Sequence, residues 1–247
     1  MKLGKIGSRS MFGWRNPYVT DGLVAYWDGE WNVGGGVHGQ NSNKWKNLIS
    51  SDGDLTMPLA SSFEIADKCV RFNGTGYATS APTNIIQASL RGTFEIVVQR
   101  GVAASGEFRN IFSCGNMVWW RSFGSTSGGP IGASAYLSSA AGFRRYSMPN
   151  VDTVELASYA FVFDKDNTQS KAVTRLYRNG SSKTNFSFPA SYGRAADIPT
   201  SDAISIGSGD NRDGVTSIYC VRVYDRNLTA AEISANYAVD KARFNLP

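Results

Sequence analysis

Carboxylates are the side chains that would hydrolyse a glycosidic bond, because that reaction needs two of them flanking the scissile bond. The chain has six glutamates, and none lies in an E-x-D-x-E arrangement, which would place carboxylates on one face of a strand. We therefore expect that the protein is not a glucanase and has no enzymatic activity. The six residues are Glu30, Glu64, Glu95, Glu107, Glu155 and Glu232.

The chain has one histidine, His38, which lies in the sequence VGGGVHG. A serine hydrolase needs a histidine beside its nucleophile, and no G-x-S-x-G motif accompanies this one. We expect His38 to be a solvent-facing side chain on a glycine-rich loop. Zinc is not indicated either, because Cys69, Cys114 and Cys220 are far apart and have no partner at metal-binding spacing. These cysteines are expected to be reduced thiols in the core.

The densest group of oxygen-bearing side chains lies in residues 207–214, GSGDNRDG. Asp210, Asn211 and Asp213 could supply the carboxylate and amide oxygens that Ca²⁺ prefers. The same composition is typical of a polar hairpin turn. Both interpretations stay open, and no other cofactor is expected.

Exposed tryptophans are well suited to bind sugars, because sugar rings have an apolar face and polar hydroxyl groups. Trp31 lies in a long segment rich in Gly and Asn and is the first candidate. Trp119 and Trp120 are adjacent, so in a strand one of them should face away from the core. The alternative is that all three are core or interface residues. Trp27 and Trp45 lie in apolar, strand-like segments and are expected in the core.

Residues 1–20 are expected to form an N-terminal arm. They contain four basic residues and no acidic one, which accounts for most of the net charge of +5. The rest of the chain is nearly neutral, so the pI of about 9.1 does not indicate nucleic-acid binding. The arm either docks the domain to a partner, or is a frayed terminus or a strap across the domain's own sheet. The side chains expected to dock are Lys2, Lys5, Arg9, Phe12, Trp14 and Arg15.

The hydropathy pattern contains no run of eighteen apolar residues, so no transmembrane helix and no membrane partner are expected. The first 22 residues have no continuous apolar stretch behind their basic residues. We therefore expect no secretory signal peptide.

Residues 21–247 are expected to form one all-β domain, an antiparallel sandwich of the jelly-roll type. Short segments rich in β-branched and aromatic residues alternate with turns such as Asn179-Gly180. In residues 217–224 the alternation has a period of two and predicts Ile218 on the same face as Arg222.

One helix is expected, over residues 229–238. Thr229 and Glu232 have the spacing of a capping box, which marks the start of a helix. Ile233 and Tyr237 follow at i and i+4, so they should lie on one face. The helix would be a short C-terminal cap on the sandwich.

Several motifs carry a family resemblance: DGLVAYWDG, WKNL, VRFNGTGYA, TFEIVVQ, LYRNG and ISIGS. The most specific is the closing pattern, R-x-Y-x-R-x-L-T-x-x-E-I followed by N-Y-x-x-D-x-x-R-F. On these residues the sequence resembles the concanavalin A-like lectin/glucanase superfamily, in particular laminin G-like domains of bacteriophage structural proteins and bacterial surface proteins. The resemblance implies a sandwich of two antiparallel sheets that binds or assembles, and it does not fix a ligand.

These observations lead to the hypothesis of a phage virion component, such as a head fibre, capsid decoration or tail-associated protein. The arm would dock it to other virion proteins, and the displayed sandwich would bind host or mucosal glycans. The resemblance also implies a homo-oligomer such as a trimer, made in the cytoplasm of a bacterial host. The alternative is a carbohydrate-binding lectin module of a bacterial surface or secreted protein.

Overall fold

The computed structural model describes part of the chain. For residues 117–123, 132–139 and 142–149, among others, it describes the backbone only. The described residues are 16–33, 36–39, 42–58, 61–73, 76–83, 85, 91–100, 108–114, 117–123, 132–139, 142–149, 155–164, 175–183, 202–207 and 215–247.

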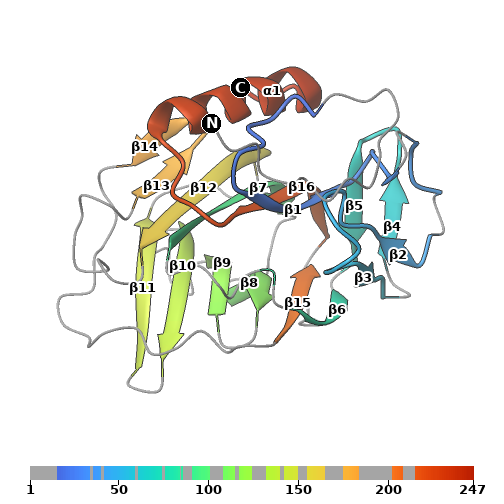
Figure 1. Cartoon of the computed structure of the whole chain (residues 1–247), viewed down its shortest axis with the longest axis horizontal. Coiled ribbons are helices and arrows are strands. Elements are labelled where there is room, and N and C mark those ends of the chain that lie inside the picture. Colours follow the sequence, from blue (N-terminus) through green and yellow to red (C-terminus); the bar gives the residue numbers. More distant parts are fainter. Residues whose placement is uncertain are drawn as a thin grey trace.

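Two antiparallel sheets form the body of the molecule, as the sequence predicted (Figure 1). We call the first the helix-side sheet. Its strands, in spatial order, are β14 (Ser181–Lys183), β13 (Arg175–Arg178), β12 (Ala157–Asp164), β7 (Arg91–Arg100), β16 (Thr216–Tyr224), β5 (Cys69–Phe72) and β4 (Ser61–Glu64), and β1 (Leu23–Asp28) also pairs with β16.

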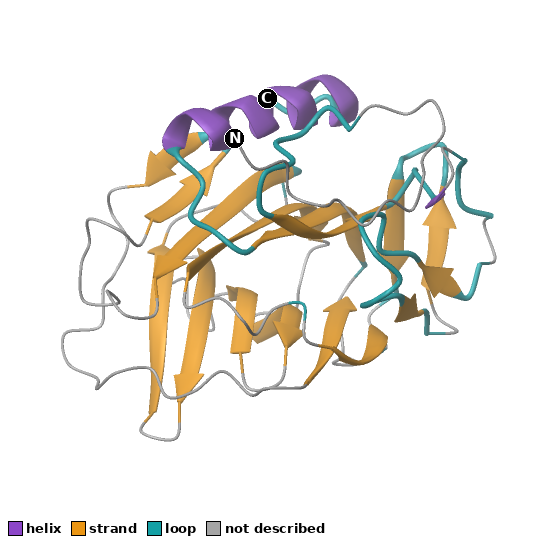
Figure 2. Cartoon of the chain, in the orientation of Figure 1, coloured by secondary structure: helices purple, strands orange, loops and turns teal. Residues whose placement is uncertain are grey.

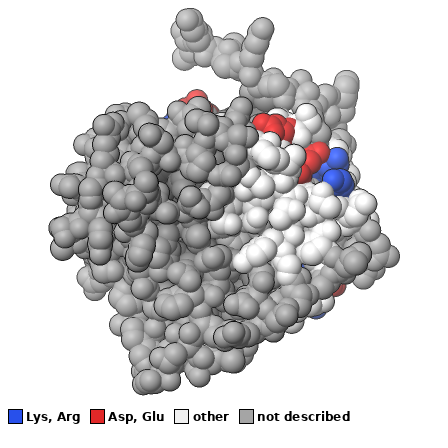
Figure 3. All heavy atoms as spheres, turned by 90° about the horizontal axis from the view of Figure 1, so that it is seen from below, with Lys and Arg blue, Asp and Glu red and all other residues white. Residues whose placement is uncertain are grey.

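The second sheet, which we call the opposite sheet, faces the first across the core. When the molecule is viewed from the side of the opposite sheet, most of the described surface is uncharged, and the charged side chains lie near the edge of that surface (Figure 3). Its strands are β11 (Gly142–Pro149), β10 (Gly132–Ser139), β9 (Met117–Phe123), β8 (Phe108–Cys114), β15 (Asp202–Gly207), β6 (Tyr77–Thr83), β3 (Leu55–Thr56) and β2 (Lys44–Trp45).

The one α-helix among the described residues, α1 (Ala230–Phe244), covers the outer face of the helix-side sheet (Figure 2). The predicted capping box is confirmed, because Thr229 Oγ1 accepts from the Glu232 backbone N–H and the Glu232 side chain accepts from the Thr229 backbone N–H. The predicted end at residue 238 is wrong. The helix ends only where Asn245 adopts a left-handed conformation with φ of 54°. No helix in the described part of the chain is long and apolar enough to cross a membrane.

Two apolar clusters hold these layers together. The first lies between the sheets and contains Trp27 and Trp45, both fully buried as predicted. The second lies between the helix-side sheet and α1 and contains Tyr18, Ile233 and Phe244. A sheet with both faces covered excludes water from its strands, and all nine residues of β16 are accordingly buried.

The register of β16 differs from the predicted alternation. The pairing with β7 shifts between Ile218 and Cys220, so one extra residue, Tyr219, is inserted. Ile218 therefore lies in the cluster between the sheets, whereas Cys220 lies in the cluster beneath α1. Because of the bulge, residues after Tyr219 face the opposite way from what the alternation before it predicts. A period-two pattern in the sequence cannot reveal such a bulge.

The Asn179-Gly180 turn is confirmed and joins β13 to β14. Both residues have positive φ, 50° and 70°, as a tight hairpin requires. A Cβ on Gly180 would lie 2.8 Å from the ring of Tyr237. The turn therefore packs directly against α1.

Candidate functional site

A fully buried arginine, Arg222 on β16, joins the helix-side sheet to α1. Its guanidinium donates to both carboxylate oxygens of Asp240 at 2.7 Å and to Glu95 Oε2 at 2.8 Å. The ring of Tyr18 lies 4.0 Å from its Cζ. Burial raises the pKa of Glu95, and the charge of Arg222 opposes that shift. We call these residues, with Asn236, the Arg222 cluster.

Asn236 of α1 completes the Arg222 cluster and ties the N-terminal segment to it. Its Nδ2 donates to Glu95 Oε2 at 2.8 Å and to the Tyr224 hydroxyl at 3.0 Å. Its Oδ1 accepts from the Val19 backbone N–H at 2.9 Å. The cluster therefore joins two strands, the helix and the segment before β1.

The sequence interpretation missed this cluster. The alternation predicted Arg222 on the face of Ile218, and the structure places it instead in the dry layer beneath α1, where a charge needs partners. A signal was present, because Glu95 and Arg222 interrupt two mostly apolar runs, residues 94–98 and 218–224, with opposite charges. Only the fold brings Asp240 of the helix to Arg222.

A second cluster centres on Asp28, the last residue of β1, which is also fully buried. Arg243 of α1 donates to its two carboxylate oxygens at 2.8 and 3.0 Å, and the Tyr26 hydroxyl also donates to it. The backbone N–H groups of Glu30 and Trp31 donate to Asp28 Oδ1, each at 2.9 Å. We call this group, with Trp31, the Arg243 cluster.

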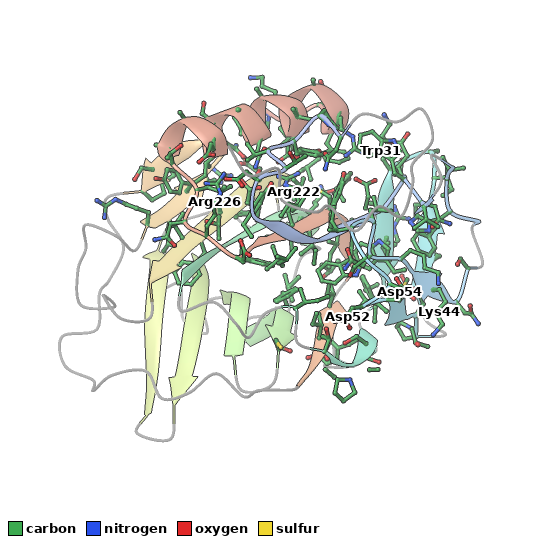
Figure 4. All side chains as sticks on the ribbon, viewed as in Figure 1. Trp31, Lys44, Asp52, Asp54, Arg222 and Arg226 are labelled. Atoms are coloured by element: carbon green, nitrogen blue, oxygen red, sulfur yellow. The ribbon has the colours of Figure 1, made fainter. Side chains whose placement is uncertain are left out.

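Trp31, the first predicted sugar-binding residue, belongs to the Arg243 cluster, and Figure 4 shows it near one end of α1. It is partly buried, and the guanidinium carbon of Arg243 lies 3.3 Å from the centroid of its ring. This stacking is a cation–π contact, which holds the indole in one orientation. Trp31 thus lies beside the C-terminal end of α1 on a loop pinned by Asp28.

The loop that carries Trp31 closes on itself. Trp31 forms a β-bridge with Val37, and the Asn32 backbone N–H donates to the Gly36 carbonyl at 2.8 Å. Val37 is 57% exposed, so the residue that pairs with Trp31 presents an apolar side chain at the surface. A closed loop with an exposed apolar residue and a fixed aromatic ring is suited to contact a ligand.

His38 closes the same loop, and the prediction that it faces solvent is wrong. The side chain is 2% exposed and stacks on Phe63, with ring centroids 4.0 Å apart. Its Nε2 lies 3.0 Å from the Asp28 carbonyl oxygen, which also accepts from Trp45 Nε1 at 2.7 Å. Burial lowers the pKa of His38, so the neutral imidazole is the favoured form.

The three cysteines are free and buried, as predicted. Burial raises the pKa of Cys69 to about 11, which disfavours the reactive thiolate. Burial also raises the pKa of Cys220, whose sulfur accepts from Arg222 at 3.3 Å. These thiols are structural parts of the core.

The other predicted site residues are placed only in part. The backbones of Trp119 and Trp120 lie in β9, where Trp120 pairs with Phe112 of β8, and their side chains are outside the description. The proposed calcium ligands, Asp210, Asn211 and Asp213, lie outside the described residues. Within the described residues, no group of three His, Cys, Asp or Glu side chains could hold a metal ion.

The expected arm is described only from residue 16 onward. Its predicted docking side chains all lie outside the described residues. The described end lies against the sandwich, where Tyr18 is 4% exposed and the Val19 carbonyl accepts from the Tyr224 hydroxyl at 3.2 Å. The chain therefore approaches β1 along the α1 side of the molecule. The predicted docking residues are Lys2, Lys5, Arg9, Phe12, Trp14 and Arg15.

Several solved structures share the fold at low sequence identity. The Trypanosoma rangeli sialidase in complex with sialic acid superposes with a TM-score of 0.58 at 15% identity, over 89% of this chain and 33% of the sialidase. The binding domain of Paraclostridial Mosquitocidal Protein 1 gives 0.60 at 12% identity, over 89% of this chain and 52% of that domain. The binding domain of botulinum neurotoxin serotype G gives 0.58 at 16% identity, over 89% and 51%. This chain therefore spans a third to a half of these proteins, and the likeness shows the fold alone.

A search of curated protein sequences found no match. A family model described as the concanavalin A-like lectin/glucanases superfamily matches residues 72–234, which include β16 and the first turn of α1. The match covers well over half of the chain and agrees with the two-sheet sandwich. The chain belongs to the concanavalin A-like lectin/glucanase superfamily.

Proposed function

We propose that this protein is a non-catalytic, carbohydrate-binding module and that Trp31 contacts the sugar. The observation that carries the proposal is the fixed, partly buried indole of Trp31, stacked on Arg243 at 3.3 Å in a closed loop. A ring already held in place loses little conformational freedom when a ligand binds. A sugar needs such an aromatic surface with polar groups nearby, and Glu30 and Lys68 supply polar groups beside the loop.

Three buried carboxylates serve the fold, which supports a non-catalytic role for them. Asp28, Glu95 and Asp240 are 0–2% exposed, and each is hydrogen-bonded to an arginine. Glycoside hydrolysis requires two carboxyl groups that reach the substrate. These three instead hold the helix on the sheet.

Glycan binding is tested on an array with the wild-type chain and two variants. We expect Trp31→Ala to lower affinity by about tenfold or more, because the stacking surface is lost. Val215→Ser, which alters another exposed apolar residue, is the matched control and should bind as the wild type does. Circular dichroism verifies that both variants are folded. Unchanged affinity of the Trp31 variant would remove this residue from the site.

We also propose that the module is displayed on a phage particle, docked to other virion proteins through its N-terminal arm. The anchoring of Tyr18 and Val19 beside α1 supports this proposal, because it holds the described end of the arm firmly against the sandwich. Display in several copies, for example as a trimer, would raise the avidity of a weak glycan site. A surface or secreted lectin module remains the competing proposal.

Deletion of residues 1–15 tests the docking role. The deletion spares Tyr18 and Val19, which pack against the sandwich, so the β-type circular dichroism should not change. We expect the shortened chain to be absent from purified particles. Its native mass by light scattering should correspond to fewer copies per oligomer than the wild type forms. Normal incorporation would refute the docking role, and a wild-type chain that is monomeric and never incorporated would favour the lectin module.

A further inference from the structure

The arginine that stacks on Trp31 belongs to a connected group of four charged side chains, whose charges cancel. Arg243 binds both oxygens of Asp28, at 2.8 and 3.0 Å, and reaches Glu30 at 3.3 Å. The ammonium of Lys68 lies 3.7 Å from Glu30. The two cations therefore each have a carboxylate partner within this group.

An acidic sugar needs a cation or several N–H donors for its carboxylate or sulfate. Arg243 is 10% exposed, and moving it onto a ligand would leave Asp28, which is 0% exposed, as a buried charge without its partner. Lys68 is more accessible at 40%, but Glu30, which is 21% exposed, lies beside it and would repel an anionic ligand. A neutral sugar meets neither obstacle, because its hydroxyl groups accept and donate hydrogen bonds without a net charge.

We infer that the Trp31 site binds neutral glycans and discriminates against glycans that carry a carboxylate or a sulfate. This inference rests on the proposed carbohydrate-binding function and adds the chemical class of the ligand. Glu30 is the residue that sets the selectivity, since its carboxylate pairs with the accessible ammonium of Lys68 and lies beside it, where an anionic ligand would have to bind.

The test compares matched pairs of glycans that differ only by a sialic acid or a sulfate, with the full chain as the receptor. We expect the wild type to bind the neutral member about tenfold more tightly than the acidic member at low salt. The difference should shrink as the salt concentration rises, because screening weakens the repulsion between exposed charges.

Glu30→Gln supplies the diagnostic variant. It removes one negative charge and leaves Lys68 without its carboxylate, so the preference for neutral glycans should narrow about threefold. Asp67→Asn is the matched control, because Asp67 lies in the same turn as Lys68 and pairs with Arg71 instead. The control should keep the wild-type ratio.

The outcomes separate the two claims. Equal or tighter binding of the acidic members by the wild type would overturn the selectivity and leave the carbohydrate-binding function standing. Binding of no glycan of either kind would overturn the function and the selectivity together. A preference that does not respond to Glu30→Gln would remove Glu30 as its cause.

Discussion

Arg222 and Arg243 have the same chemistry and different surroundings. Both connect the helix-side sheet to α1 through paired hydrogen bonds to an aspartate, and both contact an aromatic ring. The Arg222 side chain is 0% exposed, and the Arg243 side chain is 10% exposed and stacks on the ring of Trp31. The comparison separates an ion pair that only holds the fold from one that also holds a surface residue in place.

The largest expected effect is at the buried cluster. Arg222→Met leaves Glu95 and Asp240 buried without a cation, so we expect the free energy of unfolding to fall by about 3–5 kcal/mol. Urea denaturation measures the change. The control replaces all three charged groups together, as Arg222→Met, Glu95→Gln and Asp240→Asn, and should recover much of the loss. If the free energy of unfolding of Arg222→Met lay within about 1 kcal/mol of the wild-type value, the cluster would not be a stabilising connection.

Arg243→Ala should lower stability less than Arg222→Met does and should lower glycan affinity more. Asp28 loses a charged donor, which we expect to cost about 2–3 kcal/mol, and the indole of Trp31 loses its support. Glycan affinity should therefore fall as well, measured by titration calorimetry well below the melting temperature. Arg243→Lys keeps the charge and loses the planar stacking surface, so it should restore part of the stability and less of the affinity. Unchanged affinity in Arg243→Ala would contradict the link between this arginine and Trp31.

The N-terminus of α1 has a third arginine–carboxylate pair, Arg226 with Glu232, which is more exposed than the two clusters and should contribute less to stability. Hydrogen bonds from Arg226 lower the pKa of Glu232 to about 2, and bonds from Thr229 add to the shift. The Glu232 carboxylate, paired first with Arg226 and then with Thr229, therefore contributes its full stability above pH 4.5, the ordinary pKa, and loses it as the pH falls toward about 2. Thr229→Ala should lower stability by about 1 kcal/mol at neutral pH. Thermal melts between pH 2 and 7 measure both effects, and a Glu232→Gln variant with the same acid sensitivity would contradict this assignment.

The smallest expected effect concerns His38 beneath the Trp31 loop. Burial lowers its folded-state pKa, so the unfolded chain binds a proton at higher pH than the folded chain does. Its contribution to stability is complete above about pH 6.5 and declines as the pH falls below that value. His38→Asn should abolish this component of the pH dependence, seen in urea denaturation between pH 5 and 8. The Arg222 cluster contains no histidine, so variants there should retain the wild-type slope.

The C-terminal motif that carries the family resemblance supplies side chains to both arginine clusters. Its residues Arg222, Asn236 and Asp240 lie in the first cluster, and Arg243 lies in the second. The sequence interpretation recognised the pattern but assigned these residues no contacts. The reason is that their partners, Glu95 and Asp28, are more than a hundred residues away along the chain.

By itself, the sequence determined the all-β class, the Asn179-Gly180 turn, the helix start at Thr229 and the burial of Trp27 and Trp45. These features depend on local chemistry, namely turn propensity, capping and hydrophobic alternation, which neighbouring residues specify. Only the tertiary structure decided the bulge at Tyr219, the burial of His38 and the stacking of Arg243 on Trp31. Each of these depends on where distant segments meet, because a buried charge or ring is stabilised by whatever partners the fold brings to it.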